Sequence, residues 1–170
     1  AGMKLKKKNC TMKSNKAEPT QPAEVVDLFC GVGALSHGLK LAGLKVLAGY
    51  DTDEGCRFAY ESNNDAKFYK ADVSKLSAEE IKKHYSGQAP TVLAGCAPCQ
   101  PFSTAGRQRG DHDARDMFPE FVRAVLQIEP RAFVAENVLG LKSKKFSDYI
   151  AKTVIDPLAH LYEIRQFVIH

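Results

Sequence analysis

Two stretches of this sequence carry residues whose types and spacing could do chemistry, and the first is a glycine turn. The apolar run 25–29 leads directly into Cys30–Ala34, where Gly31 and Gly33 stand two residues apart. Glycines allow positive φ and close approach of the backbone to a ligand, and a helix that begins here offers unpaired N–H groups. The pattern predicts a nucleotide-type pocket, unless the glycines only turn the chain.

The neighbours of this turn narrow the choice of nucleotide. A complete dinucleotide motif has a third glycine three residues after Gly33, where this chain has Ser36, so the motif typical of NAD binding is incomplete. Asp51 follows the second apolar run, where ribose hydroxyls need an acceptor. Asp72 lies in the strand-like stretch 68–73 and could accept from an exocyclic amine. The alternative is that both acids are solvated surface groups.

The second stretch is a cysteine between Pro98 and Gln100. Cys99 forms a C-x-x-C pair with Cys96, but no second pair and no His pair completes four zinc ligands. The pair also opens a long loop and not a helix, which argues against a thioredoxin-like dithiol. We interpret Cys99 as a single nucleophile at the carboxyl end of strand 91–94, where open α/β sheets bind ligands, and Cys96 as packing.

A carboxylate and an amide, Glu136 and Asn137, end another apolar run at 132–135. A buried carboxylate is costly unless it is paired or kept protonated. Glu136 is therefore a candidate proton donor. The alternative is that Glu136 only braces a neighbouring loop.

Strand-like and helix-like patterns alternate along the chain, which predicts a mostly parallel sheet covered by helices on both faces. Residues 97–115 are too rich in turn formers and charges for core, and loops of that length are usually functional or disordered. We predict strands at 25–29, 45–50, 91–94, 132–135 and 162–169, and helices at 34–42, 53–62, 77–84, 118–128 and 147–160.

Composition limits the class of protein. A chain of 170 residues suits one domain, and no apolar run approaches the ~20 residues of a membrane span. The net charge of +4 comes entirely from the first 24 residues, with six Lys and two Glu. We predict a disordered basic tail at 1–23 and one domain at 24–170. The five cysteines follow no secretory segment, which indicates an intracellular protein.

The three motifs together resemble the cytosine-5 DNA methyltransferases. They are Asp-Leu-Phe-Cys-Gly-Val-Gly at 27–33, Pro-Cys-Gln at 98–100 and Glu-Asn-Val at 136–138, in that order. The resemblance implies a Rossmann-like class I fold that binds S-adenosylmethionine and no metal. It implies methylation of a flipped cytosine in double-stranded DNA, with S-adenosylhomocysteine as product. The usual setting is a bacterial restriction-modification system, in the cytoplasm at the nucleoid.

The same resemblance implies a role for each matching residue. Cys99 would add to C6 of the cytosine, and Glu136 would protonate or hydrogen-bond N3. The cofactor would contact Phe29, Gly31, Val32, Gly33, Asp51, Thr52, Asp72, Val73 and Pro98. The substrate would contact Gln100, Ser103, Arg107, Arg109 and Asn137, several of them on a mobile catalytic loop.

Family members continue beyond the segment that matches this chain. They carry a Gln-x-Arg-x-Arg motif and a target-recognition region. They also carry a final strand that inserts between their fifth and sixth strands, which correspond here to 132–135 and 162–169. We expect a complementary polypeptide or further sequence to supply these parts. Two alternatives stay open: a methyltransferase that acts on cytosine in tRNA, and a non-catalytic module that binds the cofactor or a partner. An NAD oxidoreductase leaves Cys99 unexplained.

Overall fold

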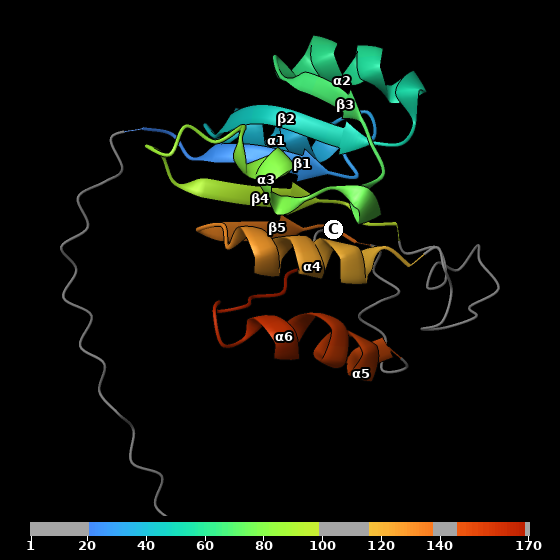
Figure 1. Cartoon of the computed structure of the whole chain (residues 1–170), viewed down its shortest axis with the longest axis vertical. Helices are drawn as coiled ribbons and strands as arrows, with labels where there is room; N and C mark the ends of the chain where they lie inside the picture. The colour runs from blue at the N-terminus through green and yellow to red at the C-terminus, as the bar shows by residue number, and fades with distance from the viewer. Residues whose placement is uncertain (1–20, 99–115, 138–145, 169–170) are drawn as a thin grey trace, which may run out of the picture.

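The computed structural model describes residues 21–98, 116–137 and 146–168. Within these ranges, five parallel strands form one sheet in the order β3-β2-β1-β4-β5 (Figure 1). This order confirms the predicted parallel sheet. The strands are β1 (Glu24–Leu28), β2 (Lys45–Asp51), β3 (Lys67–Lys70), β4 (Thr91–Gly95) and β5 (Ala132–Ala135).

Helices connect the strands, and most lie within a few residues of the predicted ranges. Helix α3 begins with a capping box between Ser77 and Glu80, and helix α4 ends at Glu129 in a left-handed conformation just before Pro130. The helices are α1 (Ala34–Leu41), α2 (Arg57–Asn64), α3 (Ala78–Lys82), α4 (Phe118–Ile128), α5 (Ser147–Ile150) and α6 (Asp156–Leu158). Two 3-10 turns, η1 (Glu54–Cys56) and η2 (Val73–Lys75), precede α2 and α3.

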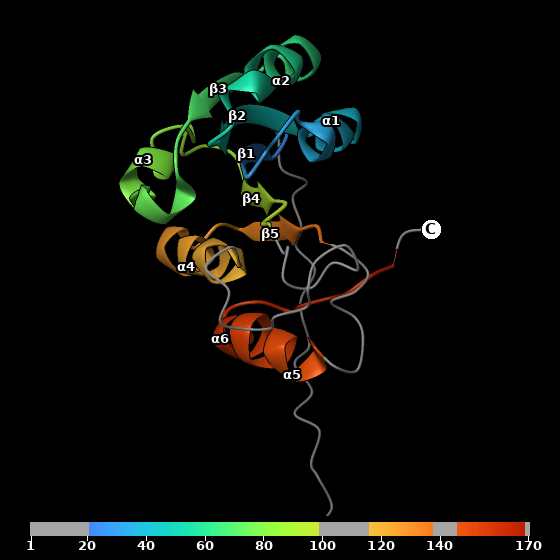
Figure 2. The ribbon, with the colours of Figure 1, turned by 90° about the vertical axis from the view of Figure 1, so that its right-hand side faces the viewer.

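The helices cover both faces of the sheet. Figure 2 shows α1 and α2 on one face, and α3 and α4 on the other. Alternate residues of β1 serve the two faces: Val25 packs in the cluster under α1 and α2, while Val26 and Leu28 pack in the cluster under α3 and α4. Both faces of β1 are fully buried, so this strand fixes the centre of the fold.

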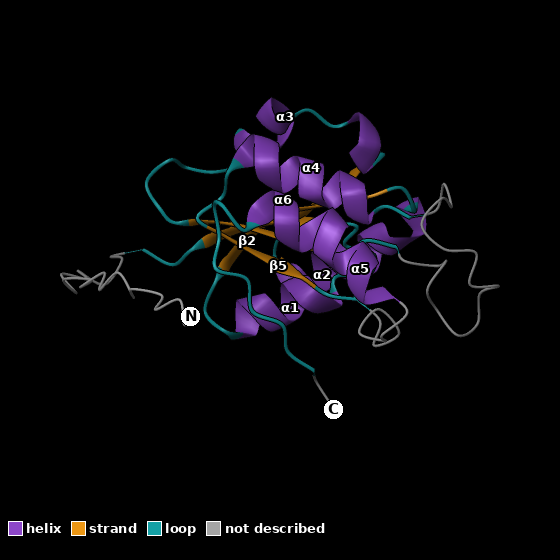
Figure 3. Cartoon of the chain, turned by 90° about the horizontal axis from the view of Figure 1, so that it is seen from below, coloured by secondary structure: helices purple, strands orange, loops and turns teal. Residues whose placement is uncertain are grey.

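The predicted helix at 147–160 is interrupted. A π-helical turn, Ala151–Ile155, joins α5 to α6, and this stretch lies beside α4 (Figure 3). None of the helices in the described ranges is long and apolar enough to cross a membrane.

The predicted strand at 162–169 is wrong for the part that the structure describes, because residues 162–168 form no strand. Tyr162 holds this segment beside β5 through its side chain. Its hydroxyl donates to the carbonyl oxygen of Pro130 (2.9 Å), and its ring packs edge-on against Phe133 at 5.1 Å. A β pattern becomes a strand only where a neighbouring strand accepts its hydrogen bonds, and no strand of the described ranges pairs with this segment.

The two edges of the sheet differ. At β3, the Phe68 N–H donates to the Glu61 carboxylate (3.0 Å), and Arg57 donates to the Phe68 carbonyl oxygen (2.8 Å). Side chains of α2 thus occupy that edge. At β5, the Glu136 N–H donates toward β4, so the N–H and C=O groups of Phe133 and Ala135 face outward. Among the described residues, no strand pairs with this outer edge.

Candidate cofactor and catalytic site

The glycine turn joins β1 to α1 at the carboxyl edge of the sheet, which the arrowhead of β2 marks in Figure 1. Three residues of the turn have positive φ: Phe29 (56°), Gly31 (49°) and Gly33 (88°). The Gly33 N–H donates to the Cys30 carbonyl oxygen (2.8 Å) and closes the turn. Helix α1 then begins without a side-chain cap. The predicted turn into a helix N-terminus is present.

A buried polar cluster supports this turn from below. Ser36 donates to the Asp27 carboxylate (2.7 Å), and its hydroxyl lies 3.0 Å from the hydroxyl of Tyr60. The Asn64 amide donates to the carbonyl oxygens of Tyr60 (2.9 Å) and Gly33 (3.4 Å). All four side chains are buried. We call Asp27, Ser36, Tyr60 and Asn64 the buried polar cluster.

The same cluster explains why Gly33 is a glycine. A Cβ at this position would lie 2.2 Å from the Asn64 amide nitrogen and 2.7 Å from the Tyr60 ring. Gly49 on β2 also lies against that ring, and a Cβ there would lie 2.3 Å from it. Close packing therefore requires both glycines, and positive φ requires a glycine at position 33 as well.

Asp27 is a buried carboxylate with no cationic partner in its hydrogen bonds. Burial, as the largest effect, raises its pKa to about 6, and the hydrogen bonds from Ser36 oppose that rise. One of its oxygens, Oδ1, has no hydrogen-bond partner. The sequence prediction gave Asp27 no role of its own, although an acid inside an apolar run was visible.

Asp51, predicted to hold ribose hydroxyls, lies beside the turn at the end of β2. Its two carboxylate oxygens accept the N–H groups of Gly31 (2.9 Å) and Asp53 (3.0 Å). The carboxylate is only partly buried, and each oxygen has a second lone pair for a ligand hydroxyl. Asp51 therefore braces the turn in this structure and keeps capacity to accept from a ribose.

The other predicted cofactor residues of this side follow β2 and β3. Thr52 is exposed next to Asp51. Asp72 accepts from the Ser74 N–H (3.0 Å) and hydroxyl (2.7 Å), and these bonds lower its pKa. Val73 is buried in the core, so its side chain faces away from solvent.

The ends of β4 and β5 bring the described members of the second predicted group close together. Gly95 pairs with Ala135, and the Glu136 N–H donates to the Gly95 carbonyl oxygen (3.0 Å). Asn137 donates to the Ala97 carbonyl oxygen (3.1 Å), and Pro98 is exposed. The residues after the two strands therefore lie side by side, with Pro98 and Glu136 at the carboxyl edge.

Glu136 differs from its predicted environment in one respect. The prediction assumed a buried carboxylate, but Glu136 is exposed. The Glu136 carboxylate lies within hydrogen-bonding reach of the Cys96 thiol. The interpretation of Cys96 as a packing residue did not include this contact. Burial, with charge from Asp27 and Glu136, raises the pKa of Cys96 to about 12.

Five predicted residues lie outside the described residues, so the structure does not test them. They are the nucleophile Cys99 and the loop residues Gln100, Ser103, Arg107 and Arg109. The predicted tail at 1–23 lies outside them too, except for its last three residues.

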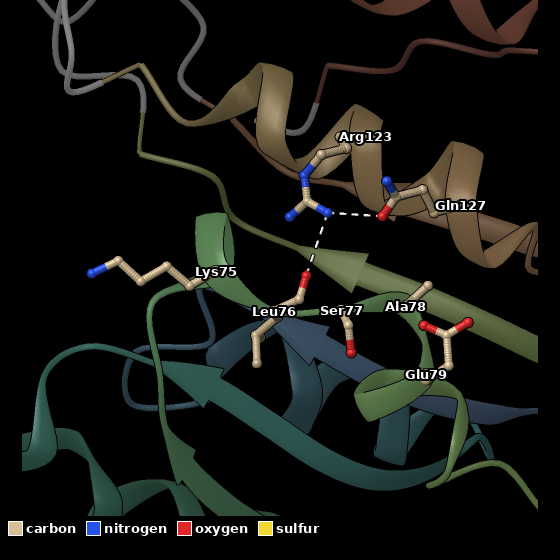
Figure 4. A pocket seen from close by; sticks show the side chains of 7 residues that line it. All are labelled: Lys75, Leu76, Ser77, Ala78, Glu79, Arg123 and Gln127. Carbon is tan, nitrogen blue, oxygen red and sulfur yellow. Dashed lines mark hydrogen bonds between the residues drawn. The ribbon is translucent and has the colours of Figure 1, made fainter.

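A surface hollow of about 520 Å³ lies between α3 and α4 (Figure 4). Arg123 reaches across it and donates to the carbonyl oxygens of Val73 (2.8 Å) and Leu76 (3.4 Å). These bonds hold η2 in place after Asp72, which makes the hollow a supporting region. It is lined by Lys75, Leu76, Ser77, Ala78, Glu79, Arg123 and Gln127, none of them a predicted site residue.

No group of three or more His, Cys, Asp or Glu residues in the described ranges is arranged to hold a metal ion.

Comparison with known proteins assigns the family. The family model of C-5 cytosine-specific DNA methylases matches residues 23–168. Among curated proteins, the type II methylase M.HgiDII of Herpetosiphon aurantiacus is 37% identical over 86% of this chain and 41% of its own length. The type II methyltransferase M.HindV of Haemophilus influenzae is 35% identical over 77% of this chain and 42% of its own length.

Solved structures agree with the fold. A protein from an E. coli prophage, assigned as a DNA modification methyltransferase, aligns with a TM-score of 0.64 and 30% identity over 81% of this chain and 38% of its own. The Dnmt2 methyltransferase of S. pombe aligns with a TM-score of 0.55, 21% identity and the same coverage of this chain, and 42% of its own. At that identity Dnmt2 supports the fold alone.

The chain spans about two fifths of the length of the curated relatives described above. Its parallel sheet, covered on both faces, is the Rossmann-like fold of class I methyltransferases. Because the family model covers nearly all of the domain, this chain belongs to the C-5 cytosine-specific DNA methylase family.

Proposed function

We propose that the protein is the cofactor-binding and catalytic part of a DNA cytosine-5 methyltransferase of a bacterial restriction-modification system, acting on DNA in the cytoplasm. The observation that carries this proposal is the family match over residues 23–168, which includes all three motifs. In the described residues, parts of these motifs lie at one edge of the sheet: the glycine turn after β1, Pro98 after β4 and Glu136 after β5.

The cofactor of the family is S-adenosylmethionine, and the residues at the turn suit it. Nothing lies within 4 Å of the Cβ position of Gly31, so a ligand has room to approach the backbone there. Val32 is 56% exposed at the start of α1. Phe29 offers a half-buried ring for an adenine, and Asp51 and Asp72 offer acceptors for its ribose and amine. Thr52, Gly33, Val73 and Pro98 complete the proposed cofactor set.

The bound cofactor supplies an electrophilic methyl group on a sulfonium. Cytosine C5 is a weak nucleophile, and we assign its activation to Cys99. The Cys99 thiolate forms a bond to C6, and the C5=C6 electron pair moves to C5, which bonds to the methyl group. The methyl–sulfur bond breaks with its electron pair on sulfur. A base then removes the C5 proton, the double bond re-forms and the thiolate leaves.

We assign Glu136 to the N3 edge of the base. A hydrogen bond or a proton at N3 absorbs the charge that the ring gains when Cys99 adds. The exposed carboxylate at the end of β5 is free to approach a base that enters this edge. The cytosine must leave the duplex stack to reach Cys99, at a cost of a few kcal/mol. We assign Gln100, Ser103, Arg107, Arg109 and Asn137 to contacts with the flipped base and nearby phosphates.

We also propose that the active enzyme needs a further part, on a second polypeptide or in further sequence, that carries the target-recognition region. Support comes from the outer edge of β5, where the backbone groups of Phe133 and Ala135 face outward. Val134 on this strand is 37% exposed. Phe167, near the end of the segment that Tyr162 holds beside β5, is 79% exposed. An edge of this kind is suited to pairing with another strand.

Covalent trapping tests the catalytic assignment. Duplex DNA with 5-fluorocytosine in the target position blocks the final proton removal, so the adduct to Cys99 accumulates in the presence of cofactor. We expect an adduct that survives denaturing electrophoresis with the complete assembly and no adduct with Cys99→Ala. Cys96→Ala is the matched control, since it removes a thiol three residues away and should keep the adduct.

Each other outcome has a clear meaning. No adduct from the complete assembly would favour a non-catalytic module that only binds cofactor. Methylation of tRNA in preference to duplex DNA would favour the RNA methyltransferase. Full methylation of DNA by the 170-residue chain alone would contradict the need for a further part.

A further inference from the structure

The feature that points beyond the proposed reaction is the buried carboxylate under the glycine turn. Asp27 is 0% exposed and lies on β1, two residues before Phe29. It accepts a hydrogen bond from Ser36 on α1, while its Oδ1 has no partner. We infer that Asp27 makes the cofactor site prefer a cationic cofactor over its uncharged product. This inference rests on the proposed function.

Asp27 is too deep to touch a ligand, so it acts through its charge. Its charge acts at three positions around the turn. Burial is the largest cause that raises the pKa of the Cys30 and Cys96 thiols, and the charge of Asp27 is the next; Asp27 and Asp51 also repel each other. These positions lie after β1, after β4 and at the end of β2. The carboxylate therefore contributes negative potential at the carboxyl ends of β1, β2 and β4.

Packing makes this potential stronger than that of a surface acid. Among the described residues, the titratable groups that interact electrostatically with Asp27 are neutral or acidic: Tyr60 from α2, the thiols of Cys30 and Cys96, and Asp51 from β2. None of these groups is a cation that would neutralise it. In a low-dielectric interior, an uncompensated charge acts over longer distances than in water.

The hydrogen bond to Ser36 does not by itself explain a carboxylate here. An asparagine would offer Ser36 an acceptor without the cost of burying a charge. A negative charge does become useful if the ligand changes its own charge during the reaction. Methyl transfer converts a sulfonium into a neutral thioether, so a fixed negative potential favours the substrate form and weakens the hold on the product.

The test compares three ligands by titration calorimetry at pH 8 on the complete assembly, in which this chain is combined with the part that completes the enzyme. S-adenosylmethionine carries the sulfonium, sinefungin carries a protonated amine in its place, and S-adenosylhomocysteine is neutral there. For Asp27→Asn we expect the preference for the two cationic ligands over the neutral one to fall about three- to tenfold, with the affinity for the neutral ligand almost unchanged.

Two controls separate charge from structure. Ser36→Ala keeps the Asp27 charge but removes its hydrogen bond, and should leave the ratio of affinities unchanged. Asp65→Asn makes the same change in net charge at the exposed far end of α2 and should leave all three affinities unchanged.

The possible outcomes separate the inference about Asp27 from the cofactor assignment. If Asp27→Asn weakens all three ligands equally, or leaves the ratio as in the wild type, the inference is overturned while the cofactor assignment stands. If the wild-type complete assembly binds none of the three ligands, the proposed cofactor site and the inference fail together.

Discussion

At the scale of single residues, Asp27 also sets how stability depends on pH. Its pKa is raised from 3.8 to about 6 in the fold, so the folded state binds its proton more tightly than the unfolded state. Stability from this group is therefore present at acidic pH and is lost as pH rises through 6. The usual salt-bridged Asp behaves in the opposite way.

Replacing Asp27 with Asn removes this pH dependence. We expect the difference in unfolding free energy between Asp27→Asn and wild type to move by about 2 kcal/mol in favour of the variant from pH 4.5 to pH 7.5. Urea unfolding at the two pH values measures this difference. A gap between the two proteins that stays constant across this range would contradict the raised pKa.

The sequence predicted single residues well where a motif fixes them and poorly where packing does. Gly31 and Gly33 were recognisable because a strand leads directly into them, and the structure gives both positive φ. The support from Tyr60 and Asn64 could not be predicted, because helix position alone does not tell which α2 side chains reach the turn. The burial of Glu136 was overestimated, since an apolar run indicates a strand but not which strand forms the edge.

At the scale of elements, the glycine turn and α2 pack too closely for an added side chain. A methyl group at Gly33 would overlap the Asn64 amide and would sit at a φ of 88°, and one at Gly49 would overlap the Tyr60 ring. We expect Gly33→Ala and Gly49→Ala each to lower the unfolding free energy by about 2–4 kcal/mol. Thermal or urea unfolding monitored by circular dichroism measures the loss.

Gly38 provides the matched control in the same region. It lies inside α1, and nothing is within 4 Å of its Cβ position. Gly38→Ala should therefore raise stability by about 0.5–1 kcal/mol, because alanine has the higher helix propensity. If Gly33→Ala destabilised the protein no more than Gly38→Ala, close packing would not be the reason for glycine at position 33.

Elements were predictable where their pattern is satisfied by local or sequential neighbours. Helix α4 matches its predicted bounds of 118–128, because an amphipathic pattern and a stop at Glu129–Pro130 define both ends. The strand predicted at 162–169 failed over residues 162–168, where the apolar residues pack by side chain, as Tyr162 does on Phe133. Its composition favours a strand, but pairing depends on a partner.

At the scale of the whole molecule, the sheet is protected on one side and open on the other. Arg57 and Glu61 occupy the backbone groups of Phe68 at the β3 edge. At the β5 edge, no strand of the described residues pairs with the outward backbone groups, and Val134 is 37% exposed. We propose that the further part of the enzyme pairs with β5, next to Glu136, so that completing the sheet and completing the catalytic edge would be one event.

Hydrogen exchange tests this placement directly. In the 170-residue chain alone, we expect the amides of Phe133 and Ala135 to exchange rapidly, because their N–H groups face away from β4. With the complementary part added, a new strand would accept these hydrogen bonds and slow exchange roughly a hundredfold or more. Leu93 and Ala94 in β4 are the internal reference, since β4 lies between β1 and β5 in either state.

Slow exchange at Phe133 and Ala135 without the complement would show that the edge is already covered, and unchanged fast exchange in an active assembly would place the further part elsewhere. Protection that appears together with methyl transfer would tie the open edge to the chemistry at Glu136.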